Sequence, residues 1–311
     1  MKKKSNYLIY AFFLCSLCYV YTAQPQNIDT AKPVTDSTSA KDEALRSKKT
    51  IEDAVVAMEY ALVNAKFACP RYLLALSSYL HAKGKISDAT SIAQSAKGLL
   101  ELVEKELMKV KTEKDAYMVG IKDLGLKEDM LRYVRLLIQA ADNQIRSYKS
   151  ADTGAGNVAK KYLEDAARYN AIIEKLLREP LAANDDTMLR LSMGMCPRWL
   201  TTLSESLYAD KLQLTKQASS KKGIVCGECT IAAQASTDIS KVFGKEVTAG
   251  TNDTVLRDKY AAYITAMVNY AQGLVEAYKT GNESIAVDAL KFQKEALAKE
   301  KEIADYLASK N

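Results

Sequence analysis

Apolar residues recur at alternating spacings of three and four along most of the chain, the pattern of amphipathic helices. No stretch shows the sustained apolar–polar alternation that predicts a strand. The sequence therefore predicts an all-α protein with short connections between its helices. We expect buried apolar stripes over residues 51–69, 73–80, 92–110, 130–148, 158–176, 256–278 and 285–307.

Two short segments resemble each other across a large sequence separation. Cys-Pro-Arg-Tyr-Leu at 69–73 recurs as Cys-Pro-Arg-Trp-Leu at 196–200, an offset of 127 positions. Near the end of each stretch, Tyr148 matches Tyr278 at an offset of 130. We expect two tandem, internally duplicated antiparallel bundles, at 41–180 and 185–311. The motif residues that recur beside the cysteines and prolines are Arg71, Tyr72, Arg198 and Trp199.

Proline and glycine mark the expected helix ends. Pro70 has no amide hydrogen to donate to a continuing helix, so we expect a break there with Pro70 at the start of the next helix. In the second copy, the polar segment 219–230 contains glycine and Cys226-Gly227-Glu228-Cys229, and we expect it to form a loop.

The first residues have the character of an export signal. Three lysines precede an apolar run over 7–21, which is short for a membrane span. We expect a signal peptide at 1–23 and a flexible tether at 24–40, rich in Ser, Thr, Asp and Pro. A retained anchor and lipidation at Cys15 or Cys18 are the alternatives. Export to a periplasm, cell surface or extracellular space, with no stable membrane span after cleavage, follows from this interpretation.

Charge argues against one class of partner. Removing the three signal lysines lowers the formal charge from +6 to +3. The remaining charges alternate in sign along the helices and form no basic block. We therefore expect no nucleic-acid partner, and the identity of a protein or small-molecule partner is not encoded in any motif.

Four cysteines remain after the expected cleavage. An even number in an exported protein favours disulfides, with three connectivities. Cys226 with Cys229 and Cys69 with Cys196 is the pairing that matches the repeat. The alternative for Cys69 and Cys196 is that they are small buried hydrophobic residues with free thiols.

The Cys-x-x-Cys unit also permits thiol-redox chemistry or binding of a soft metal, zinc or copper. Met193 and Met195 beside Cys196 supply further soft ligands for Cu(I) if the loop folds back toward them. A single Cys-x-x-Cys is a weak signal, and Thr230 stands where a c-type haem motif requires histidine. Our leading expectation is therefore no cofactor.

Catalytic motifs are absent from the sequence. His81 is the single histidine, which excludes multi-histidine metal sites and permits a Ser-His-Asp triad only if His81 itself is the base. No phosphate-binding glycine loop is present. We expect no catalytic residues and a non-enzymatic helical binding or scaffold protein, with a thiol-redox or soft-metal protein using Cys226 and Cys229 as the alternative.

Overall fold

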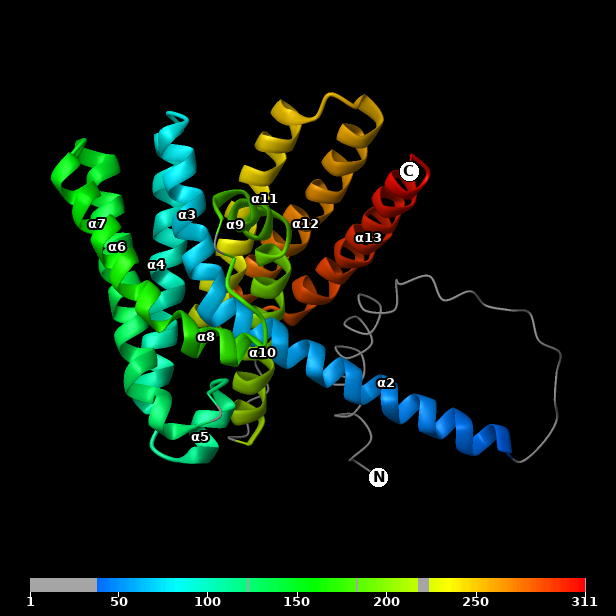
Figure 1. The fold of residues 1–311 in the computed structure, drawn as a ribbon. Coiled ribbons are helices and arrows are strands. Elements are labelled where there is room, and N and C mark those ends of the chain that lie inside the picture. The colour runs from blue at the N-terminus through cyan, green and yellow to red at the C-terminus, as the bar shows by residue number, and fades with distance from the viewer. Residues whose placement is uncertain (1–37, 122, 183, 218–223, 311) are drawn as a thin grey trace. The chain divides into compact units, whose positions relative to one another are not determined.

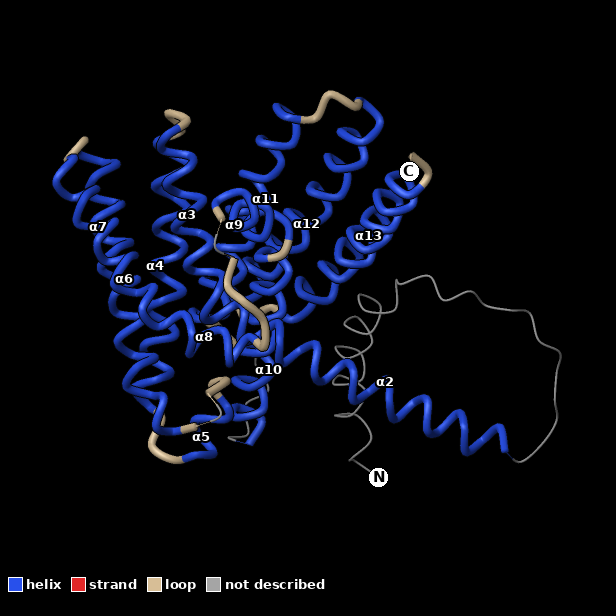
Figure 2. The backbone as a smooth tube through the Cα atoms, in the orientation of Figure 1, coloured by secondary structure: helices blue, strands red, loops and turns tan. Residues whose placement is uncertain are grey.

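The computed structural model describes residues 38–121, 123–182, 184–217 and 224–310. These residues form helices and connections, with no strand among them, which confirms the all-α prediction (Figure 2). The chain divides into two compact units, one ending at Ala61 and the other running from Leu62 to Asn311. None of the described helices is both long and apolar enough to cross a membrane.

The helices follow one another with short connections (Figure 1). In chain order they are α2 (Thr38–Val63), η1 (Asn64–Ala68), α3 (Cys69–Ala82), α4 (Ile86–Lys109), α5 (Glu113–Met118), η2 (Leu124–Leu126), α6 (Lys127–Ser150), α7 (Thr153–Ala166), η3 (Ala167–Tyr169), α8 (Asn170–Leu177), α9 (Asp185–Gly194), α10 (Cys196–Gln217), α11 (Gly227–Gly250), α12 (Thr254–Thr280) and α13 (Glu283–Ala308).

Local sequence explains where most of these helices begin. Asp152, Asn184, Asp253 and Asn282 each accept a hydrogen bond from a backbone amide in the first turn of the helix that follows. Such caps satisfy amides that have no partner within the helix. Gly281 ends α12 in a left-handed conformation, with φ of 69°, which glycine adopts without a steric penalty.

The expected break at Pro70 takes the form of a different helix type. The π-helical turn η1 precedes Cys69, and Pro70 lies in the first turn of α3. The wider turn leads into α3 without a loop. Amides in the first turn of a helix have no acceptor within that helix, so the missing amide hydrogen of Pro70 costs α3 no hydrogen bond. Helix type therefore changes at Cys69 while the direction of the chain continues.

The larger unit contains two runs of successive packed helices. α3, α4, α6 and α7 pack in that order, and α10, α11, α12 and α13 do the same. Between the two runs, α4 packs against α11 (Figure 1). These two helices are antiparallel, because Asp88 near the start of α4 binds Lys245 near the end of α11 at 2.7 Å. Ser95, about two turns further along α4, donates to Asp238 at 3.0 Å.

The segments that lead into each run make reciprocal contacts. η1, which leads into α3, also packs against α10, and α9, which leads into α10, also packs against α3. Each leading segment therefore helps to cover the first long helix of the other run. This arrangement joins the two runs at their starts as well as at the α4–α11 contact.

The predicted apolar stripes supply most of the core. Leu73, Leu76 and Leu80 on α3 are fully buried, and the same holds for Tyr270, Leu274 and Tyr278 on α12 to within 2%. The prediction is wrong at three stripe positions, since Val55 is 37% exposed, Val158 is 41% exposed and Leu307 is 40% exposed. α7 and α13 are the last helices of their runs, and each packs on one face against the helix before it. Small residues fill much of these two contacts; the buried alanines are Ala155, Ala159, Ala166, Ala289 and Ala296.

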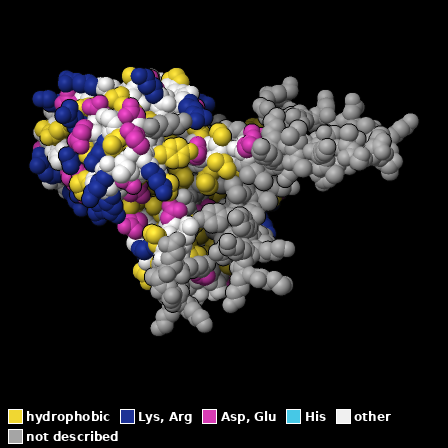
Figure 3. All heavy atoms as spheres, turned by 90° about the horizontal axis from the view of Figure 1, so that it is seen from below, with side chains coloured by type: hydrophobic (Ala, Val, Ile, Leu, Met, Phe, Trp, Pro, Cys, Tyr) yellow, Lys and Arg dark blue, Asp and Glu magenta, His cyan; other side chains and the backbone are white. Residues whose placement is uncertain are grey.

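The expected signal peptide at 1–23 and most of the tether at 24–40 lie outside the described residues. Residues 38–40, counted with the tether, already belong to α2. Of the loop expected over 219–230, residues 227–230 are instead helical, because α11 begins at Gly227. On the described surface seen in Figure 3, basic and acidic side chains are interspersed.

Candidate functional site

A disulfide joins Cys226 to Cys229 at the first turn of α11, with Cα atoms 5.3 Å apart. Cys226 is the capping residue, and its sulfur accepts a hydrogen bond from the Cys229 amide at 3.2 Å. The Cys226 amide in turn donates to the carbonyl of Tyr278 at 2.9 Å. The disulfide therefore closes the first turn of α11, and the hydrogen bond to Tyr278 holds this turn beside the end of α12.

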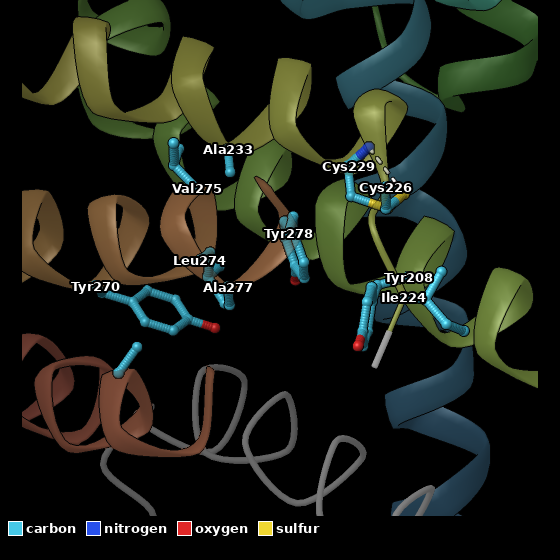
Figure 4. Packing of buried hydrophobic residues seen from close by; sticks show 11 residues of the cluster. Tyr208, Ile224, Cys226, Cys229, Ala233, Tyr270, Leu274, Val275, Ala277 and Tyr278 are labelled. Atoms are coloured by element: carbon cyan, nitrogen blue, oxygen red, sulfur yellow. Dashed lines mark hydrogen bonds between the residues drawn. A yellow bond between two sulfur atoms is a disulfide. The ribbon is translucent and has the colours of Figure 1, made fainter. Parts of the chain in front are cut away.

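The disulfide lies inside an apolar cluster. Cys226 is 1% exposed and Cys229 is fully buried. The rings of Tyr208 and Tyr278 pack 4.8 Å apart beside it, as Figure 4 shows. A disulfide in such surroundings is shielded from solvent-borne thiols, since exchange requires access to one of the two sulfurs.

Cys69 and Cys196 also lie together, as free thiols. Each is the first residue of its helix, α3 or α10, and both are fully buried. A side-chain hydrogen bond joins the two. Burial, followed by the interactions with Cys196, raises the pKa of the Cys69 thiol well above its usual value. The structure thus brings this predicted pair into contact without a covalent bond.

The proposed soft-metal set is not assembled by these elements. Met193 lies in α9 and Met195 caps its end, and both are partly exposed. The sulfurs of Cys226 and Cys229 are bonded to each other. Among the described residues, no group of three or more His, Cys, Asp or Glu side chains could hold a metal ion.

Arg198 of the second motif holds three helices of its run together. Its Nε donates to the hydroxyl of Tyr263 on α12 at 3.2 Å, and its guanidinium forms an ion pair with Glu300 on α13. The guanidinium also lies 5.8 Å from the centre of the Tyr263 ring. Burial alone lowers the pKa of this arginine, but Tyr263 and Glu300 outweigh it and keep the group charged.

Arg71 of the first motif has a corresponding set of partners. Its guanidinium donates to the amide oxygen of Asn170 at 2.6 Å, and its charge lowers the pKa of Tyr133, which burial raises. Tyr133 and Asn170 precede Tyr263 and Glu300 by the same 130 positions that separate the later parts of the two runs. Asn170 and Glu300, which are 130 positions apart, therefore each bind a motif arginine, with a neutral amide in one case and a carboxylate in the other.

The aromatic residues near the motifs correspond too. In the first run, Tyr148 lies 3.3 Å from the hydroxyl of Ser77 and stacks on His81 with ring centres 4.4 Å apart. In the second run, Tyr278 forms a hydrogen bond with Ser204 and packs against Tyr208. His81 is thus an exposed residue whose ring stacks on Tyr148.

Glu205 is the residue that sequence analysis missed. Its carboxyl group accepts a hydrogen bond from the Tyr270 hydroxyl, which itself accepts one from Gln293 Nε2 at 3.0 Å. Burial raises the pKa of this carboxyl to about 8. One signal was available in the sequence, because the residue 127 positions earlier is Ser78, so a charged side chain follows the second motif where a neutral hydroxyl follows the first.

We expect Arg198→Ala to lower the free energy of unfolding by about 1–2 kcal/mol, less than for a fully buried ion pair because Glu300 is partly exposed. Arg71→Ala, which removes a partner of a neutral amide, is the matched comparison. Urea denaturation of both variants, and of Glu300→Gln alone and with Arg198→Ala, measures the coupling. Additive effects of Arg198→Ala and Glu300→Gln would contradict the pairing.

Fold and site together define a helical protein in which the motif arginines, Arg71 and Arg198, are bound to side chains of the same chain. No family model, curated protein or solved structure matches the chain. Its function is therefore argued from its own geometry.

Proposed function

We propose that the protein is an exported, non-enzymatic helical binding or scaffold protein of a cell envelope or extracellular space, composed of two duplicated helical bundles. The proposal of export rests on the basic and apolar character of residues 1–23. The proposal of duplication rests on the recurring motif and on the matching packing order of the two runs.

The observation that carries the proposal is the pair of corresponding arginine clusters. Arg71 and Arg198 are the most distinctive polar residues of the repeat, and each is bound to side chains of helices that follow it in the chain. Arginine used in this way fixes the relative positions of helices. A rigid, repeated frame with alternating surface charge is typical of a protein that presents surfaces to partners.

The Cys226–Cys229 bond has a structural role under this proposal. It closes the first turn of α11, where the Cys226 amide donates to the carbonyl of Tyr278 near the end of α12, and both cysteines are buried. A structural disulfide resists reduction, with a potential below about −300 mV, whereas catalytic dithiols are more oxidising and exposed.

The test compares the exported, mature protein with a Cys226→Ser/Cys229→Ser variant. We expect the native disulfide to be reduced only by strongly reducing buffers. The protein should show no turnover in the reduction of a protein disulfide substrate. Its thermal unfolding midpoint should be higher than that of the variant. A thioredoxin-type substrate turnover that disappears in the variant would contradict the proposal.

Thiol-redox activity is the second candidate, and one observation favours it. Cys226 occupies the capping position of α11, where backbone amides and the helix dipole stabilise a thiolate. The redox titration above separates the two candidates, because a reactive dithiol exchanges at a potential within the range of cellular oxidoreductases.

A further inference from the structure

The first step concerns how the chain places Cys69 and Cys196. Each opens a long helix and is followed by proline, whose fixed backbone angle holds the first turn in one conformation. The segments before them, η1 and α9, each pack against the first long helix of the other run. This reciprocal packing brings two residues 127 positions apart in sequence to one buried place.

The second step concerns their surroundings. Both residues are fully buried, and a hydrogen bond joins their side chains. Tyr72, 3% exposed, lies near both thiols, and burial is the largest cause that raises the pKa of its hydroxyl. That hydroxyl accepts a hydrogen bond from the Ala182 amide at 3.4 Å, in the connection before α9. The two thiols therefore lie together, shielded from solvent.

We propose that Cys69 and Cys196 form a second disulfide, which joins the two runs covalently when the protein folds in an oxidising compartment. The inference rests on the export that is part of the proposed function, and does not depend on binding or scaffolding. It follows from contact, burial and correspondence of the two cysteines. Two thiols in contact within an exported chain are the ordinary precursor of such a bond.

The chemistry requires a disulfide-containing oxidant, either a low-molecular-mass disulfide or an oxidoreductase in its disulfide form. The thiolate of one cysteine attacks the oxidant, forms a mixed disulfide and releases one oxidant thiol. The thiolate of the second cysteine then attacks the protein sulfur of the mixed disulfide and releases the second oxidant thiol. The protein gains one S–S bond and loses two protons, while the S–S bond of the oxidant is reduced to two thiols.

Timing follows from burial. Reaction requires the thiolate, and burial raises the pKa of the Cys69 thiol in the folded protein. Exchange therefore proceeds before the two runs close on each other, while the cysteines remain accessible. Once the bond has formed, the same burial protects it from reductants, so mild reduction of the folded protein should leave it intact.

The test uses the full mature chain with a specific protease site introduced into the connection between Arg178 and Asp185. Cys226 and Cys229 both lie in the second fragment, so their bond cannot hold the fragments together. After cleavage and denaturation without reductant, we expect the fragments to migrate as one species, and to separate when reductant is added. Cys196→Ala with the same protease site is the matched control and should give separate fragments in both conditions.

Mass spectrometry provides a measurement on the unmodified protein. After denaturation without reductant, we expect an alkylating reagent to modify no cysteine of the mature chain, and to modify all four after reduction. Alkylation of Cys69 and Cys196 without reductant, or fragments that separate without reductant, would overturn the proposal. The loop is long, so the Cys69→Ala/Cys196→Ala variant should also unfold roughly 10 °C below the oxidised protein.

Discussion

Raising the pH from 4 to 9 should lower the free energy of unfolding through Glu205 by on the order of 4 kcal/mol. Burial raises the pKa of this carboxyl to about 8, against 4.5 as the ordinary value. Below pH 4.5 the group is neutral in both the folded and the unfolded chain. Between 4.5 and 8 the unfolded chain loses the proton while the folded chain keeps it, so stability falls as pH rises, and the loss is complete above pH 8.

The hydrogen bond from Tyr270 acts in the opposite direction, because it favours the ionised carboxylate. It therefore reduces the size of the effect without reversing its sign. Urea denaturation across pH 4–9 measures the profile, and the difference between the native protein and Glu205→Gln isolates this residue from other titrating groups.

Glu295→Gln, an exposed carboxylate on α13, is the matched control and should leave the profile unchanged. We expect Glu205→Gln to flatten the profile and to be more stable than the native protein at pH 9. A native profile that matches that of Glu205→Gln would show that the carboxyl does not hold its proton in the folded state.

Gly273→Ala should destabilise the protein by about 2–3 kcal/mol, although alanine favours a helix over glycine by about 1 kcal/mol. A Cβ atom at position 273 would lie 2.6 Å from the Cβ of Ala289, far inside contact distance. α12 and α13 would have to separate along their packed faces to accept the methyl group. Urea denaturation at neutral pH measures the change.

Two variants make this prediction specific to the α12–α13 contact. Gly273→Ala/Ala289→Gly moves the methyl group from one helix to the other and should recover most of the lost stability. Gly194→Ala, where no atom lies within 4 Å of the added Cβ, should be neutral or slightly stabilising. Equal losses for Gly194→Ala and Gly273→Ala would assign the effect to glycine itself and not to helix packing.

The fold class and most of the core were predictable because both depend on local periodicity. Leu73, Leu76 and Leu80 follow from spacing alone, since a helix places residues three and four apart on one face. Val158 was misassigned because periodicity does not show how many neighbours a helix has. α7 has its main partner on one side, and an apolar residue away from that side remains exposed.

The candidate site was predictable only in part, because its key contacts join distant segments. The Cys226–Cys229 bond was expected from the short spacing of the two cysteines together with the predicted export. Glu205 was not recognised because one carboxylate within an amphipathic helix ordinarily faces solvent. Its burial depends on Tyr270 and Gln293, which approach from α12 and α13 only after the bundle has formed.

The reciprocal packing of η1 on α10 and of α9 on α3 has a consequence for how the chain acquires its structure during synthesis. A ribosome delivers α3 about a hundred residues before α9, so the apolar surface that α9 covers stays open over that interval. The first run therefore cannot complete its packing before α9 is synthesised, whatever the helix propensity of its sequence. The packing of α3 is completed only after α9 has been synthesised, and the contact between α4 and α11 forms later still.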